Sequence, residues 1–151
     1  MVNTIFDPEL RKDIIQRATS IHEKCEPKWG KMNVSQMLRH CKLWDSWVQG
    51  YGEWEYFNGS RGLEFEAAAL KAITADNTPI NRNANASNLF IVTEIVPDFE
   101  SEKQEWIQRL EAYSKFHNPS FIHDFFGFMN KEQIGILAYK HNDHHLRQFG
   151  V

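Results

Sequence analysis

Four segments of the chain combine the chemistry that starts an α-helix with apolar residues at helical spacing. Asp7 and Pro8 place a capping carboxylate before a proline at the first helical position, where a missing N–H costs nothing. Three further segments open with the form of a capping box, at Asn33, Ser101 and Asn130. An apolar stripe then runs along each segment. The pattern predicts long amphipathic helices over about residues 8–24, 34–49, 101–116 and 130–149.

Four such helices in 151 residues favour an all-α four-helix bundle that forms a single domain over residues 1–151. A long loop joins the second and third of them. Within it, the alanine-rich residues 63–73 predict a short helix, and the asparagine-rich residues 74–87 predict irregular structure. Residues 89–96 are apolar and β-branched, which suits a short strand or an extended segment. We expect the extended segment, because no second strand signal lies beside it.

Charge and composition exclude several classes of partner. The net charge of −3 gives no basic pattern of the kind that nucleic-acid-binding proteins carry. No stretch approaches the roughly 18 apolar residues of a membrane helix, and the N-terminal residues lack the apolar centre of a signal peptide. Cys25 and Cys41 are too few for a disulfide framework. We therefore expect a cytoplasmic protein with reduced thiols that binds neither nucleic acid nor a membrane.

Three of the seven histidines fall in one five-residue stretch inside the last predicted helix. At about 100° per residue, His141 and His145 continue its apolar face, with His144 at the margin and Asp143 on the solvent side. Their i, i+4 spacing lets two imidazoles reach one ion. The same spacing also occurs in histidine pairs on helix surfaces, so the pair alone leaves both interpretations open.

A third histidine, His40, lies at the centre of the apolar face of the second predicted helix, beside Trp44 and Trp47. Alone, it fits a hydrogen-bonded core histidine better than a metal ligand. An unpaired buried imidazole costs about 1–3 kcal/mol, and one metal ion explains all three placements together. Three imidazoles suit Zn²⁺, Ni²⁺, Cu²⁺ or Fe²⁺ and leave a coordination position open, as in catalytic sites.

Three stretches of the sequence resemble a domain-of-unknown-function branch of the DinB/YfiT-like metalloenzyme superfamily. They are WGKMNVSQMLRHC, FFGFMNKEQIG and YKHNDHHLRQFG, the last containing the motif HxxHHLRQFG. The resemblance implies an antiparallel four-helix bundle with crossover connections. It also implies a divalent ion, commonly nickel or zinc, held by His40, His141 and His145. At the segment beginning with His123, Asp124 replaces the proline usual in this branch, so the resemblance assigns His123 no role.

The resemblance further implies a metal-dependent enzyme that acts on a small-molecule substrate. A metal ion with an open position lowers the pKa of bound water to about 7, or binds and deprotonates a thiol. Metal-bound water or thiolate would be the reactive species of a hydrolase or of an S-transferase with a low-molecular-weight thiol cosubstrate. Zinc or nickel is the favoured ion, with iron, manganese or copper as alternatives.

Two further expectations concern the surroundings of this site. Gln148 lies on the inner helix face and is a candidate for orienting a ligand or the substrate. The aromatic segment from Trp47 to Phe57 suits a pocket wall or the interface of a homodimer. The alternative to an enzyme is a non-catalytic module that senses or sequesters a metal or another small ligand.

Overall fold

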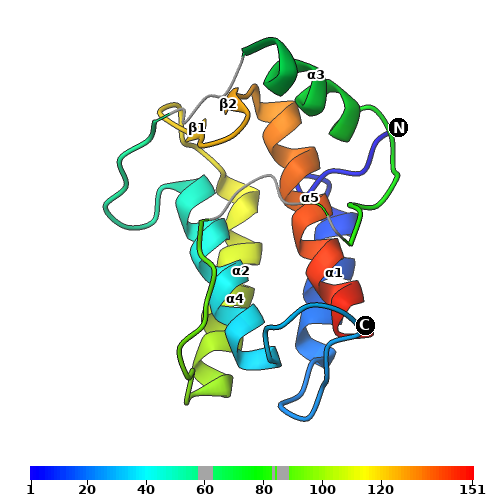
Figure 1. The fold of residues 1–151 in the computed structure, drawn as a ribbon, viewed down its shortest axis with the longest axis vertical. Helices are drawn as coiled ribbons and strands as arrows, with labels where there is room; N and C mark the ends of the chain where they lie inside the picture. The colour runs from blue at the N-terminus through cyan, green and yellow to red at the C-terminus, as the bar shows by residue number, and fades with distance from the viewer. Residues whose placement is uncertain (58–62, 83, 85–88) are drawn as a thin grey trace.

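Four long helices lie side by side (Figure 1). The computed structural model describes residues 1–57, 63–82, 84 and 89–151. The long helices are α1 (Pro8–Ser20), α2 (Val34–Gln49), α4 (Phe99–Ala112) and α5 (Lys131–Gln148). α1 and α2 each pack against both α4 and α5. The short helix α3 (Leu63–Ile73) lies with a small hairpin, β1 (Ile122–His123) and β2 (Gly127–Phe128), at one end of the long helices.

Ion pairs between α2 and α4 show the relative direction of these two helices. Arg39 on α2 pairs with Glu102 on α4 at 2.7 Å, and one turn further along both helices Lys42 pairs with Glu105 at 2.8 Å. Residue numbers rise together, so α2 and α4 run parallel. Figure 1 shows α1 and α5 running together in the opposite direction. The long connection between α2 and α4 returns the chain to the end at which both helices begin.

The predicted helix starts are confirmed in three of four cases. The Asp7 carboxylate accepts hydrogen bonds from the first turn of α1, and complete capping boxes form at Asn33 and Asn130. The start predicted at Ser101 is wrong. Helix α4 begins two residues earlier, at Phe99, because the side chain of Asp98 accepts the Ser101 N–H at 3.0 Å and so acts as the N-cap.

Two of the predicted helix ends are too late. Helix α1 ends at Ser20 rather than near residue 24, because Ile21 turns to an extended conformation. The carbonyl of Ile21 then accepts a hydrogen bond from Lys103 Nζ at 2.7 Å. Lys103 is too distant in the sequence for a local pattern to include it. Helix α4 ends at Ala112 and continues only as the 3₁₀ turn Tyr113–Lys115.

The connection between α2 and α4 contains the predicted helix α3 with the bounds 63–73. Residues 89–96 form no strand, as predicted. The described residues 74–82 and 84 are irregular, as predicted, and the rest of the predicted loop lies outside the described residues. The fold is therefore mostly helical, but the hairpin of β1 and β2 was missed and the protein is not purely α-helical. None of the helices in the described part of the chain has the length and apolarity that crossing a membrane requires.

Gly135 on α5 lies where the N-terminal segment crosses the helix. A Cβ there would overlap Thr4 Oγ1 and lie 2.5 Å from the Phe6 ring. In an open helix, Gly→Ala would stabilise the protein by about 1 kcal/mol. Here we expect Gly135→Ala to lower the free energy of unfolding by about 1–3 kcal/mol, because this overlap forces the N-terminal segment to shift. Urea unfolding of wild type and variant measures the change.

The matched control for this prediction lies on α3. Ala68 is exposed in the middle of that helix, so Ala68→Gly should lower the free energy of unfolding by about 1 kcal/mol through helix propensity alone. Helix propensity alone would stabilise Gly135→Ala and destabilise Ala68→Gly. If both substitutions lower the free energy of unfolding, the loss at Gly135 must come from the overlap with the N-terminal segment. A Gly135→Ala protein as stable as wild type would contradict the prediction.

Candidate metal centre

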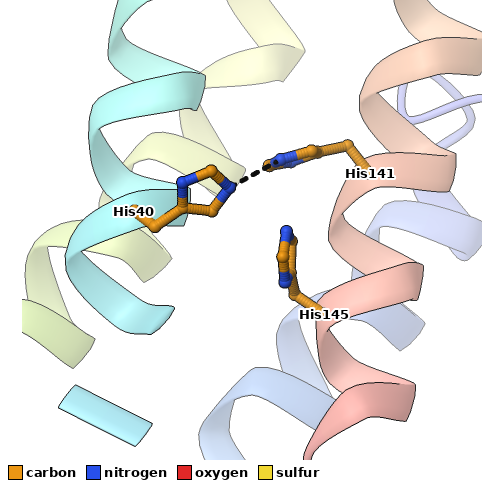
Figure 2. A group of neighbouring side chains, drawn as sticks. All are labelled: His40, His141 and His145. Carbon is orange, nitrogen blue, oxygen red and sulfur yellow. Dashed lines mark hydrogen bonds between the residues drawn. The ribbon is translucent and has the colours of Figure 1, made fainter. Parts of the chain in front are cut away.

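Three histidine side chains from two helices converge between α2 and α5. His40 projects from α2, and His141 and His145 project from successive turns of α5, with the three rings facing one another (Figure 2). The Nε2 atoms of His40 and His141 are 3.1 Å apart. One nitrogen from each of the three rings lies within 4.8 Å of the other two. The structure thus brings together all three of the residues that were predicted from the sequence as metal ligands.

The outer nitrogens of two rings are held by hydrogen bonds. His40 Nδ1 lies 2.7 Å from the carbonyl oxygen of Phe90, and His145 Nδ1 lies 2.8 Å from Gln148 Oε1. The amide nitrogen of Gln148 donates to the carbonyl of Trp29, which turns its oxygen toward His145. Because both acceptors are oxygens, each Nδ1 carries the proton and each Nε2 keeps a lone pair. Such outer hydrogen bonds orient histidine ligands in metal sites.

His141 has a different environment. Its ring stacks on Trp44 with centroids 4.0 Å apart and an interplanar angle of 15°. Its buried Nδ1 has no hydrogen-bond partner among the described residues. Without a cation, His141 Nε2–H can donate to the lone pair of His40, which leaves the lone pair of His145 without a donor in this cluster. With a cation between the rings, all three Nε2 lone pairs have a partner.

Burial keeps the three imidazoles neutral. It lowers the pKa of His40, and it lowers the pKa values of His141 and His145 well below the usual range, with repulsion between the neighbouring rings adding to the effect. At pH 7 these rings are therefore unprotonated at one nitrogen. This is the form of histidine that binds a transition metal.

The histidines open into a cavity of about 280 Å³. Its described lining is mostly apolar and aromatic and contains no carboxylate and no lysine or arginine. The lining residues beside the three histidines include Trp44, Leu89, His123, Phe126, Leu137 and His144. The cavity can therefore hold a small, largely uncharged molecule against the three imidazoles.

One strained residue supports the position of His40. Phe90 has a φ of +63°, a left-handed conformation that non-glycine residues rarely adopt. In this conformation its carbonyl meets His40 Nδ1, and its ring packs edge-on against Trp47 and Trp54. Strained backbone of this kind persists where the surrounding contacts hold it, often at functional sites.

The other predicted site residues have mixed outcomes. Gln148 faces inward, as predicted, and contacts His145 rather than the cavity. His144 lines the cavity beside the cluster, with its ring in a T-shaped contact with Trp29. Asp143 does not face solvent. It is buried between Arg17 at 2.8 Å and Arg147 at 2.7 Å, because α1 supplies a cation opposite this face of α5.

Two polar residues near the site were not identified as important from the sequence. His123 is buried in the hairpin and lines the cavity. Helical periodicity could not find it, since it lies outside the helices. Asp45, next to Trp44, is completely buried and accepts hydrogen bonds from Trp106, Tyr113 and Asn142. No motif marks it.

Comparison with protein-family models places these features in a wider group. The model described as "Protein of unknown function (DUF1569)" matches residues 8–150. Comparison with curated proteins and with solved structures found no match. The matched residues include all the described helices, both strands and the three clustered histidines. The chain therefore belongs to the DUF1569 family of proteins of unknown function.

Proposed function

We propose that His40, His141 and His145 bind a divalent transition metal and that the protein is a metal-dependent enzyme acting on a small molecule. The reaction would be S-transfer with a low-molecular-weight thiol, or hydrolysis. The observation that carries the proposal is the convergence of three neutral imidazoles at the wall of an apolar cavity. Two of them already have their outer nitrogens engaged, as ligands do.

The geometry of the cluster fits a metal ion after small side-chain movements. Metal–nitrogen bonds of 2.0–2.1 Å in a tetrahedral site separate the ligand nitrogens by roughly 3.3 Å. The pair His40 and His141 is already at 3.1 Å, while the widest separation in the cluster is within 4.8 Å. An all-imidazole set suits zinc or nickel, and iron, manganese or copper are alternatives. A bound ion would supply Lewis acidity and lower the pKa of a coordinated water or thiol.

The residues of the chain would bind and orient the substrate. Trp44 stacks behind His141 and holds its ring in place, and Gln148 does the same for His145 through a hydrogen bond. The apolar lining excludes bulk water from the reacting groups. Any proton transfer would use water, the substrate or a histidine, because no carboxylate lines the described part of the cavity.

The fold and cellular setting extend the proposal. We propose a four-helix bundle of the DinB/YfiT-like type with a crossover between α2 and α4. The two oppositely directed helix pairs and the ligand positions on α2 and α5 support this assignment. A cytoplasmic location agrees with two free cysteines. A homodimer stays a prediction.

One observation favours a second candidate function. The described lining of the cavity carries no carboxylate to act as a general base. A binding module that senses or sequesters a metal or small ligand needs no such group. Turnover separates the two candidates.

The test of the enzyme proposal is a screen for turnover with tag-free protein loaded with Zn²⁺ or Ni²⁺. Low-molecular-weight thiols are combined with monobromobimane, and small esters are assayed for hydrolysis. We expect activity with one class, and we expect His145→Ala to reduce it at least about 100-fold, since even outer-shell losses at metal sites cost 10–100-fold. Activity unchanged by that substitution would contradict metal catalysis, and metal binding without turnover would favour the binding module.

A further inference from the structure

His123 presents a second polar group to the cavity, from an element that carries none of the three clustered histidines. It lies on β1 and is only 2% exposed. Its ring is held between aromatic neighbours, with centroids 5.2 Å from Trp47 and 4.8 Å from Phe126. It lines the same cavity as His40 and His141. The hairpin thus closes one side of the site with an imidazole whose orientation is restricted by packing.

Backbone hydrogen bonds fix the tautomer of this ring. His123 Nδ1 accepts the N–H groups of Phe125 at 3.0 Å and Phe126 at 3.1 Å. Two donors aimed at one nitrogen require a lone pair there, so the proton must be on Nε2. Asp124 Oδ1 is 3.4 Å from the same nitrogen, too far to compete with the two N–H groups. Burial lowers the pKa of His123 to about 3, which keeps the ring neutral.

The Nε2–H of His123 has no acceptor among the residues that the structure describes. This atom is not one of the fully enclosed side-chain atoms that lack a partner, so it remains accessible from the cavity that His123 lines. Because Nδ1 is already hydrogen-bonded, the Nε2–H is the polar group through which the ring can bind a molecule in the cavity. A neutral imidazole N–H can bind and polarise a carbonyl oxygen without adding a charge to the site.

We propose that His123 binds the carbonyl oxygen of the ligand, so that the cavity takes small carbonyl compounds with apolar substituents. The lining supports this class over anionic oxygen ligands. No lysine or arginine in its described part would balance a phosphate or carboxylate bound at His123. A carbonyl oxygen accepts the single hydrogen bond that His123 offers and carries no charge. The assignment of this ligand as a substrate rests on the proposed function; the binding contact does not.

The experiment compares two probes of the same shape, acetophenone and α-methylstyrene, in which a carbonyl oxygen is replaced by a methylene group. Affinities for metal-free protein are measured by NMR titration in the presence of a chelator. The variant is His123→Asn, whose Oδ1 can still accept the Phe125 and Phe126 N–H groups but which has no donor reaching the cavity. We expect the preference for acetophenone to be about 3–10-fold larger in wild type than in the variant, the usual effect of one hydrogen bond.

Two further measurements keep the result interpretable. His123→Gln restores a donor near the position of Nε2 and should recover part of the preference, which a purely structural role of His123 would not predict. Long-range ¹H–¹⁵N spectra of wild type should show the neutral Nε2–H tautomer of His123 at pH 6. An Nδ1–H tautomer, a protonated ring, or an acetophenone preference that is absent or unchanged in His123→Asn would overturn the proposal. Since no metal is present, failure of metal binding or turnover would leave this test unaffected.

Discussion

Zinc or nickel at saturating concentration is expected to raise the melting temperature of wild type and to leave that of His145→Ala unchanged. A ligand that binds only the folded state at 100 times its Kd stabilises that state by about 2.7 kcal/mol. Loss of one of three imidazoles should weaken binding by more than about 100-fold, because the loss of an outer-shell partner alone costs 10–100-fold. Thermal unfolding with and without ion, and competition with a chelator, measure both quantities.

The neighbouring histidine provides the matched control. His144 is next to His145 in sequence and lines the same cavity, but it is not part of the cluster. The affinity of His144→Ala for the metal ion should therefore stay within a few-fold of wild type. The affinity of Gln148→Ala should lie between those of the two histidine variants. Equal losses in His144→Ala and His145→Ala would contradict the assignment. So would less than about 0.1 metal per chain in wild type supplied with either ion, since intact sites bind such ions tightly.

The helices could be predicted from the sequence because their signals are local. Asn33 and Asn130 form their capping boxes with residues three positions later, so the pattern contains both partners. The errors arise where a distant residue takes part. Helix α1 stops at Ser20 with the next carbonyl bound by Lys103, which lies 82 positions away from Ile21. The hairpin was missed because its strands have two residues each, too few for any alternating pattern.

The three clustered histidines could be predicted for the same reason. His141 and His145 share a helix face by spacing alone, and His40 marks the centre of another apolar face. The groups that form hydrogen bonds with these rings could not be predicted. The carbonyl of Phe90 reaches His40 from 50 residues away, through a backbone conformation that no sequence pattern indicates. His123 was left without a role since its function depends on where the hairpin places it.

The alignment of α2 and α5 at the site depends on a buried carboxyl group beside it. Asp45 Oδ1 accepts hydrogen bonds from Tyr113 at 2.6 Å and from Asn142 at 3.0 Å, and its Oδ2 accepts one from Trp106 at 3.1 Å. Asp45 follows Trp44, and Asn142 follows His141. The Asp45–Asn142 contact therefore fixes the two helices in the register that brings His40 opposite His141.

This carboxyl group should make the stability of the protein depend on pH. Burial raises the pKa of Asp45 from 3.8 to about 7, and its three hydrogen bonds oppose only part of that effect. The folded state thus holds a proton that the unfolded state releases above pH 4. Stability from this group is present in full below pH 4 and is lost as pH rises through 7. Between pH 5 and pH 9 the loss should amount to about 3 kcal/mol.

Asp45→Asn removes this titration while keeping the shape of the side chain. The amide nitrogen that the substitution introduces would face the Trp106 indole N–H, and the lost hydrogen bond destabilises the variant by an amount that does not itself depend on pH. Only the wild type then loses stability at this position as pH rises. The difference in the free energy of unfolding between wild type and variant should therefore shrink by about 3 kcal/mol from pH 5 to pH 9. Urea unfolding at both pH values measures this difference.

Tyr113 and Cys41 do not affect this comparison. Burial raises the pKa values of both well above their usual range and keeps them neutral in the folded state. A difference that stays constant with pH would mean that Asp45 is charged throughout and that its hydrogen bonds outweigh the cost of burial.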